Sequence, residues 1–372
     1  MVPLITPLIT RRRCLLLTIT LAACIWAVTF VLIHEEPLTQ YAVRPEESEA
    51  SSAFAGTPAD TSMASKVPPP TTTTLPSADA YVPVVVIFTS ADRNWTLVHK
   101  LIRCLRSMFA FATAPVNLIF ISDRKSFDVA ESVIKRNVTS DKARVRISFL
   151  DLEDALLITA KDIQPLQERF RSNDSSYSHN VFLLSIVMHK LLPFHHQVLY
   201  VDVDIAFQAD FSLLFKHFER FSPDQLIGLA YEQQPVYRHA LESFRTTHPN
   251  TTVGEPPNKG HPGFNTGVIL FDLDKMRSNK KFSSVLAKAS ILNLTAKYEL
   301  QGNLSNQDTF SLLGFEYPQW FYVLPCEWNR QLCAWWKNNG FAHEFKSYHV
   351  CNKTPKIYHA NCNTKLPLLR LQ

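Results

Sequence analysis

The sequence predicts an α/β fold with a mainly parallel central sheet, preceded by one transmembrane helix and a flexible stem. Three observations favour this architecture. Apolar β-branched runs alternate with helical patterns between residues 82 and 272, the runs suit strands that are buried on both faces, and an uncharged apolar run spans residues 14–33. The chain has 372 residues, of which 46% are hydrophobic, enough for a large core of one or two domains.

The N-terminal run, CLLLTITLAACIWAVTFVLI, has the length that an α-helix needs to cross about 30 Å of hydrocarbon. Three arginines at 11–13 precede it, so we expect residues 1–13 to stay in the cytoplasm and the C-terminal bulk to be lumenal, as in a single-pass type II membrane protein. A cleaved signal peptide is the alternative. It is disfavoured because the run exceeds the usual hydrophobic region and no small-x-small cleavage site follows closely.

Residues 34–80 are rich in Pro, Ser, Thr and Ala and hold few large apolar groups, which predicts a flexible, O-glycosylated stem. Residues 81–372 then form the lumenal domain. Seven N-x-S/T sequons agree with a lumenal location, at Asn94, Asn137, Asn173, Asn250, Asn293, Asn303 and Asn352. The formal net charge is only +5 and no basic block follows residue 13, so nucleic acid is excluded as a partner.

Five cysteines belong to the lumenal domain. Cys326, Cys333, Cys351 and Cys362 cluster near the C-terminus, and in an oxidising lumen they predict two local disulfides whose pairing the sequence leaves open. Their spacings, C-x6-C and C-x10-C, are poor zinc patterns. Cys104 lies in an apolar helical pattern and is expected to be a buried free thiol.

The elements of the domain follow in order from hydrophobic periodicity. Six strands are predicted at residues 82–88, 116–122, 143–150, 197–201, 226–231 and 266–272. Helices are predicted at 92–112, 125–137 and 178–192, the last ending before Pro193. In such a sheet the ligand site is expected at the carboxyl ends of the strands.

Two carboxylates follow the fourth strand in LYVDVDIAF. Asp202 and Asp204 repel each other unless a cation lies between them. Alternate residues of a strand share a face, and a bend just past the strand end would let both carboxylates reach one ion. A solvated loop after a strand is the plain alternative.

Three later segments carry further polar candidates. PGFNTGVILFDLDKM (262–276) combines Gly263 and Gly267, which permit close backbone approach, with Asn265, which offers a donor and an acceptor. LSNQDTFSLLGF (304–315) reads as a helix start capped by Ser305 or Asn306, with Gln307 and Asp308 in the first turn, where an acid often only complements the helix dipole. IYHANCNTK (357–365) supplies His359 and Lys365.

In this order, the D-x-D, the N-x-G strand start, the acid/amide pair opening a helix and the late H-x-x-x-x-x-K resemble the retaining, glycogenin-like GT-A glycosyltransferases of family 8. The resemblance spans about residues 81–366. It is stronger still to animal members that transfer xylose from UDP-xylose in α-1,3 linkage to xylosyl-glucose on EGF-like repeats of Notch-type proteins, in the segments YVDVDIAF, HPGFNTGVILFDL, SNQDTF, LPCEWNRQLCAWW and IYHANCNTK. It implies a GT-A fold and a membrane-anchored enzyme of the endoplasmic reticulum or Golgi.

The resemblance also implies roles for individual residues. Asp202, Asp204 and His359 would bind Mn²⁺ or Mg²⁺, a ligand set that suits Mn²⁺ better than calcium. The UDP-sugar would be bound by Phe88, Thr89, Ser90, Asp202, Val203, Gly267, Asn361 and Lys365. Asn265, Gln307 and Asp308 would surround the donor sugar as the catalytic residues.

The chain departs from the family pattern at three positions. The pair is Gln307-Asp308 rather than acid then amide, Cys362 replaces the Gly of H-x-x-G-x-x-K, and Ser185 stands where many relatives carry Arg or Lys. Two other readings stay open, a UDP-glucose or UDP-galactose enzyme and a non-catalytic glycan-binding protein. A metal-dependent phosphoesterase is disfavoured because no second cluster of ligands is present.

Aromatic residues between the candidate cystines offer faces that can stack on sugars or anchor a protein partner. Trp328, Trp335 and Trp336 in CEWNRQLCAWW are therefore the candidates for contacting an O-glycosylated EGF-like acceptor. Ordinary core packing is the alternative for each of them.

Overall fold

The computed structural model describes residues 81–137, 144–167, 181–300 and 305–367. The transmembrane helix and stem predicted at 14–80 lie outside these residues. Within them, no helix combines the length and apolar character needed to cross a membrane.

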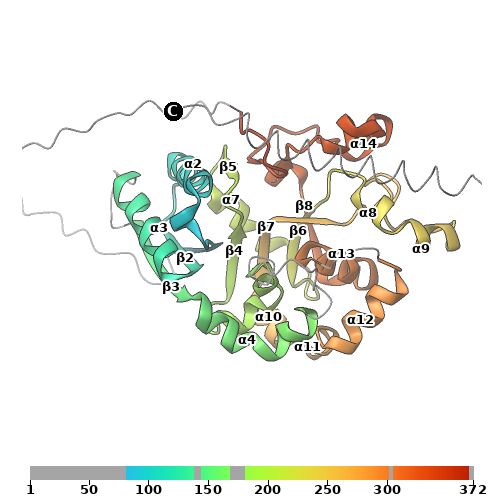
Figure 1. Cartoon of the computed structure of the whole chain (residues 1–372), viewed down its shortest axis with the longest axis horizontal. Helices are drawn as coiled ribbons and strands as arrows, with labels where there is room; N and C mark the ends of the chain where they lie inside the picture. The colour runs from blue at the N-terminus through green and yellow to red at the C-terminus, as the bar shows by residue number, and fades with distance from the viewer. Residues whose placement is uncertain (1–80, 138–143, 168–180, 301–304, 368–372) are drawn as a thin grey trace, which may run out of the picture. The chain divides into compact units, whose positions relative to one another are not determined.

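A seven-stranded sheet in the order β3-β2-β1-β4-β7-β6-β8 forms the centre of the domain (Figure 1). Its strands are β1 Val82–Ile87, β2 Val116–Ser122, β3 Val145–Asp151, β4 Gln197–Val201, β6 Ile227–Tyr231, β7 Phe264–Asp272 and β8 Phe321–Leu324. Four neighbouring pairs are parallel, whereas β7 runs antiparallel to both β4 and β6. The expectation of a mainly parallel sheet is confirmed, while the direction of β7 and the existence of β8 were not predicted.

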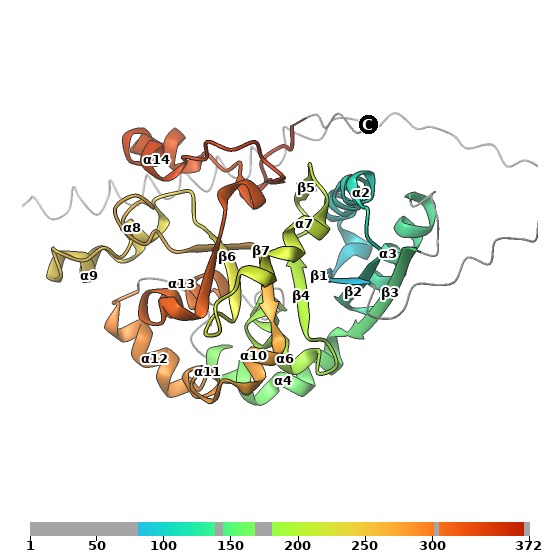
Figure 2. The same cartoon turned by 180° about the vertical axis from the view of Figure 1, so that it is seen from behind.

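The sheet is buried on both faces. Val84 and Val86 pack in one core cluster and Val85 in another, as the alternation of side chains along a strand requires. The first cluster lies under α2 Trp95–Phe111 and α3 Arg124–Asn137, and the second under α4 Leu152–Gln167 and α13 Asn306–Glu316. Seen from behind, α10 to α13 lie together below β6 and β7 (Figure 2).

Helix starts follow local capping. Asn94 accepts a hydrogen bond from Leu97 N, so α2 begins at Trp95 rather than at 92. The helix predicted at 178–192 is divided, within the described residues, into a 3₁₀ turn at Leu184–Val187 and α6 Met188–Leu191. The other helices are α7 Phe211–Phe215, α8 Val236–Ala240, α9 Glu242–Thr247, α10 Leu273–Ser278, α11 Lys280–Val285, α12 Lys288–Lys297 and α14 Ala342–Tyr348.

A second, three-stranded sheet brings the C-terminal segment to the end of β4. It contains β5 Ile205–Phe207, β10 Ile357–His359 and β9 Arg330–Gln331 in the order β5-β10-β9. β10 is antiparallel to β5, and His359 pairs with Ile205. Ala360 N also donates to Asp204 O at 2.8 Å. The late histidine therefore lies beside the two carboxylates in space, although it is far from them in sequence.

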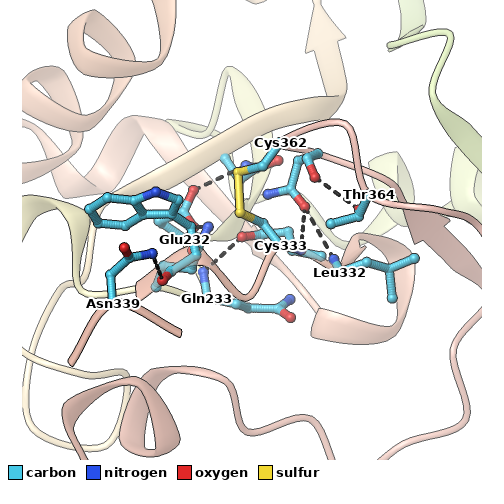
Figure 3. Close-up of a disulfide and its surroundings, with 12 residues drawn as sticks. Glu232, Gln233, Leu332, Cys333, Asn339, Cys362 and Thr364 are labelled. Atoms are coloured by element: carbon cyan, nitrogen blue, oxygen red, sulfur yellow. Dashed lines mark hydrogen bonds between the residues drawn. A yellow bond between two sulfur atoms is a disulfide. The ribbon is translucent and has the colours of Figure 1, made fainter. Parts of the chain in front are cut away.

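Two disulfides hold this C-terminal region, as the cysteine cluster predicted. They join Cys326 to Cys351 and Cys333 to Cys362, and Cys104 is a buried free thiol, as expected. Figure 3 shows the second disulfide linking the chain just after β9 to the loop after β10. His359 ends β10 and Lys365 lies in this loop, so the disulfide restrains the segment that reaches the carboxylates.

Removing the Cys333–Cys362 disulfide by a double serine substitution should lower stability by about 2–5 kcal/mol and should also weaken divalent-cation binding, because the loop after β10 loses its restraint. Removing Cys326–Cys351 should cost similar stability with a smaller effect on cation binding. Thermal unfolding and a Mn²⁺ titration of the full-length variants check both statements. Equal loss of cation affinity in the two variants would contradict the restraint.

Candidate functional site

Three potential metal ligands converge at the carboxyl end of β4. Asp202 and Asp204 occupy the turn between β4 and β5, and Asp202 N donates to Gly267 O, which keeps this turn against β7. Nε2 of His359 lies 3.3 Å from Oδ1 of Asp204 and 3.7 Å from Oδ2 of Asp202. One ligand atom from each residue falls within 4.8 Å of the others. The three can therefore coordinate one small cation, and the residues present fit the ion that the resemblance implies.

The electrostatics of this cluster show why a cation would be favourable. Burial raises the pKa of Asp202 to about 6, and the charge of Asp204 adds to the effect. Burial also opposes ionisation of Asp204, but its hydrogen bond to His359 lowers the pKa overall. For His359, burial would lower the pKa, yet the hydrogen bond to Asp204 raises it. A partly buried negative charge thus has only partial compensation from protein groups.

Two neighbouring side chains complete the surroundings of the carboxylates. Tyr200 donates its hydroxyl to Asp202 at 2.9 Å. Lys100, from α2, places Nζ 3.5 Å from Asp204 and 3.0 Å from Oδ1 of Asn363. Lys100 and Lys365 line a cavity of about 510 Å³ that also borders Asp204. This cavity has a cationic rim suited to a phosphate group.

The end of β1 borders a second cavity, of about 300 Å³, lined by Thr89, Ser90 and Asp123 among others. Ser90 adopts a left-handed conformation with φ 58°, and its N–H donates to Asp123. Phe88 differs from this pair because its ring is buried in the core. Of the predicted uridine contacts, Thr89 and Ser90 therefore face the cavity, whereas Phe88 packs behind it.

A buried polar cluster lies where the resemblance places the donor sugar. Asn265 in β7 donates to Glu232 at 3.0 Å and to Oε1 of Gln307 at 3.2 Å. Gln307 in turn donates to Glu232 at 3.3 Å. Glu232, just after β6, is 1% exposed, and burial raises its pKa. The structure thus brings Asn265 and Gln307 together around a carboxylate that sequence reasoning did not single out.

Asp308 has its carboxylate fully engaged at the start of α13. Ser305 is the N-cap, and its N–H and hydroxyl both donate to Oδ2 of Asp308, forming a capping box. Tyr237 donates to Oδ1 at 2.9 Å. The geometry matches the plain capping alternative and makes Asp308 a group that fixes the first turn of α13 and so the position of Gln307.

Gly267 lies against the ring of the candidate metal ligand His359. A Cβ atom at this position would lie 2.2 Å from Cε1 of His359, far inside van der Waals contact. Only glycine lets the imidazole approach β7 this closely. Gly267 therefore acts through His359, by leaving room for its ring.

The loop after β10 explains one departure from the family pattern. Cys362, at the position of the usual glycine, has φ 57°, a left-handed conformation that non-glycine residues rarely adopt. Its disulfide to Cys333 holds it there. Asn361 uses Oδ1 to accept from the N–H groups of Leu332 and Cys333, so its side chain shapes the loop.

Val203, between the two aspartates, is half-buried against the core.

The three tryptophans separate into two groups. Trp328 is 1% exposed, packs in the core and donates Nε1–H to His217, so the expectation that it contacts an acceptor is wrong: its faces are covered. Trp335 is 54% exposed. Trp336 stacks on His239 with ring centroids 4.6 Å apart. Of these three tryptophans, Trp335 and the half-buried Trp336 can present aromatic surface to a partner.

Comparison with known proteins identifies the family. The protein-family model described as glycosyl transferase family 8 matches residues 106–365 of the sequence. The chain belongs to glycosyl transferase family 8. It is 37% identical to human xyloside xylosyltransferase 1 over 293 residues. The aligned region covers 76% of this chain and 74% of that protein. It is also 28% identical to rat xylosyl- and glucuronyltransferase LARGE2, over 63% of this chain and 30% of that one.

Solved structures agree with the family. The crystal structure of mouse xyloside xylosyltransferase 1 in its apo form matches with a TM-score of 0.71 at 35% identity, covering 77% of this chain and 99% of that chain. The bifunctional glycosyltransferase WbbM, at 16% identity and a TM-score of 0.52, is similar in fold alone. These matches confirm the expected family and its α/β GT-A-like architecture.

Sequence reasoning missed three residues of the site. Glu232 follows the strand LIGLAY in YEQQP, and an acid at the carboxyl end of a sheet strand was a signal for it. Lys100 faces Asp204 from α2, and only the packing of α2 on β5 reveals it. Asn329, buried beside His359, gave no local signal at all.

Replacing Gly267 with alanine should reduce Mn²⁺ affinity strongly, by about tenfold or more, because the new methyl displaces the His359 ring. The effect should be non-additive with His359→Ala, since the clash disappears when the ring is absent. Mn²⁺ titrations of the two single variants and the double variant measure this coupling. Unchanged affinity in Gly267→Ala, or full additivity, would refute the proposed contact.

Proposed function

We propose that this protein is a retaining, Mn²⁺-dependent glycosyltransferase that transfers xylose from UDP-xylose, in α-1,3 linkage, to xylosyl-glucose on EGF-like repeats. The observation that carries the proposal is the convergence of Asp202, Asp204 and His359 beside Asn265 and Gln307. Family membership and the likeness to human and mouse xyloside xylosyltransferase 1 support the choice of xylose.

Asp202, Asp204 and His359 would hold the ion, and Mn²⁺ or Mg²⁺ when bound supplies Lewis-acid neutralisation of the UDP leaving group. Lys365 adds positive charge next to the diphosphate. Lys100 can take the place of the cation that many relatives carry where this chain has Ser185, because its ammonium already lies beside Asp204. Thr89 and Ser90 would bind the uridine end in the neighbouring cavity.

The side chains near the sugar favour same-face attack over two inversions. Oε1 of Gln307 accepts from Asn265 and lies 3.4 Å from Thr266 N, while its Nε2 donates to Glu232. Such an amide is held rigidly and is a poor nucleophile. Asp308 is occupied by the capping box, and the carboxylate of Glu232 is fully buried and accepts from Asn265 and Gln307. The acceptor hydroxyl oxygen would bond to the anomeric carbon as the bond to UDP breaks, and its proton would pass to the departing phosphate oxygen.

The protein's contribution is then positioning and charge stabilisation. Gln307 and Asn265 would contact the sugar, with Asp308 fixing α13 beneath it. The donor could instead be UDP-glucose or UDP-galactose, which differ from UDP-xylose by a hydroxymethyl group. A non-catalytic glycan-binding role is less favoured because the complete metal ligand set is present.

The acceptor surface is proposed at the exposed Trp335 and the half-buried Trp336 beside it. Trp335 and Trp336 lie in contact with each other at 5.2 Å between ring centroids, just after Cys333, and they can pack on a glycosylated EGF-like repeat.

For the location, we propose the membrane of the endoplasmic reticulum, with the Golgi as the alternative. There residues 14–33 would anchor a lumenal domain.

The test incubates full-length protein with Mn²⁺, a xylosyl-glucosyl EGF-like repeat and, in turn, UDP-xylose, UDP-glucose and UDP-galactose. We expect transfer of xylose above the other sugars and an α-linked product by NMR. Asp204→Asn should lower turnover by orders of magnitude because the ion loses a ligand. Asp128→Asn, an exposed aspartate on α3, is the matched control and should keep wild-type turnover.

Each part of the proposal has its own contradicting outcome. Equal transfer from UDP-glucose would refute the donor assignment, and a β-linked product would refute retention. Wild-type turnover in Asp204→Asn would remove the metal role. No transfer from any of the three donors would favour the glycan-binding reading.

A further inference from the structure

A continuous series of hydrogen bonds joins the metal ligand to the sugar side of the site. Nδ1 of His359 lies 3.1 Å from Oδ1 of Asn329. Nδ2 of Asn329 donates to Oδ1 of Asn265 at 2.9 Å. Asn265 donates onward to Glu232 and Gln307. Asn329 is the link between the two halves of the site.

The direction of every bond in this series is fixed by a backbone donor. Gly267 N–H, at 3.2 Å, can only donate, so the atom of Asn265 that faces it must be the oxygen. The amide nitrogen of Asn265 then points to the Glu232 carboxylate and to Gln307. Asn329 must offer its nitrogen to the Asn265 oxygen, which leaves its own oxygen facing His359.

An oxygen at that place selects one form of the histidine. The imidazole must carry a hydrogen on Nδ1 in order to donate to Asn329, so Nε2, which donates to Asp204 when no ion is bound, can give up its hydrogen and offer its lone pair to an ion between Asp202 and Asp204. The same hydrogen bond fixes the plane of the ring. A carboxamide meets both requirements, because it can accept from the histidine and donate to Asn265 at the same time.

We propose that Asn329 is a positioning residue that sets the tautomer and orientation of His359 and couples the metal ligand to the Asn265–Gln307 pair. The inference rests on the proposed metal site. Asn329 suits this task because it is fully buried and its backbone is held on both sides, by Cys326 O and by the side chain of Gln233.

The two hydrogen bonds of the Asn329 side chain, to His359 and to Asn265, can be tested separately. Asn329→Leu removes both hydrogen bonds and should weaken Mn²⁺ binding by about 10–100-fold. Asn329→Asp keeps an acceptor for His359 but has no donor for Asn265. It should recover most of the Mn²⁺ affinity while raising the KM for UDP-xylose and lowering kcat, because two oxygens then oppose each other beside the sugar site.

The measurement is Mn²⁺ affinity of the full-length proteins by the EPR signal of free Mn²⁺, with UDP-xylose kinetics and thermal unfolding in parallel. Asn117→Leu is the matched control: Asn117 is a buried asparagine on β2, bonded to Ser148 and remote from the site. It should leave Mn²⁺ affinity unchanged. If Asn329→Leu does not fold, Asn329→Asp still tests the inference, because it should retain Mn²⁺ affinity while its KM and kcat change.

Three results would overturn the inference. Wild-type Mn²⁺ affinity in Asn329→Leu would show that His359 needs no such partner. An equal loss in Asn329→Leu and Asn329→Asp would indicate a merely structural role. Absence of Mn²⁺ binding by the wild-type protein would overturn the proposed metal site itself. This outcome can be told apart from failure of the Asn329 inference, because it is measured on the protein without any substitution.

Discussion

Two partly buried carboxylates of like charge at the end of β4 are the constraint on which the rest of the site depends. Asp202 and Asp204 are held in a turn that β7 and β10 fix from two sides, so they cannot move apart to reduce their repulsion. Protein groups compensate them only in part, through Lys100, Tyr200 and His359. A cation bound among these groups, as we propose, would relieve this repulsion.

The topology supplies everything that surrounds this turn. The antiparallel β7 places Gly267 against His359 and Asn265 near Gln307, so one strand borders both the metal ligands and the sugar end. The C-terminal segment returns through β10, and the Cys333–Cys362 disulfide restrains it. The candidate metal ligand His359 and the proposed sugar-binding residues Asn265 and Gln307 thus belong to one buried polar network.

Much of this could be predicted from the sequence because it is locally encoded. Strand β4 and its terminal aspartates follow from an apolar run, and the cap of α13 follows from Ser305 and its spacing to Asp308. Lys100 and Asn329 could not be predicted, because Lys100 lies 104 residues from Asp204, and Asn329 lies 30 residues from His359 and 64 from Asn265. No local pattern specifies such partners, which are selected only when α2 and the loop after β8 pack beside β5 and β7.

The most direct test of the central constraint is thermal unfolding of the full-length wild-type protein and of Asp202→Asn at pH 8, each in EDTA and with Mn²⁺ and UDP. Because burial raises the pKa of Asp202 above its usual range, its ionised form costs stability at this pH when no cation is present. Asp202→Asn should therefore unfold at a higher temperature than wild type in EDTA, and should lose most of the stabilisation that Mn²⁺ and UDP give the wild type. A lower unfolding temperature for Asp202→Asn in EDTA, or an undiminished gain with Mn²⁺ and UDP, would contradict the account.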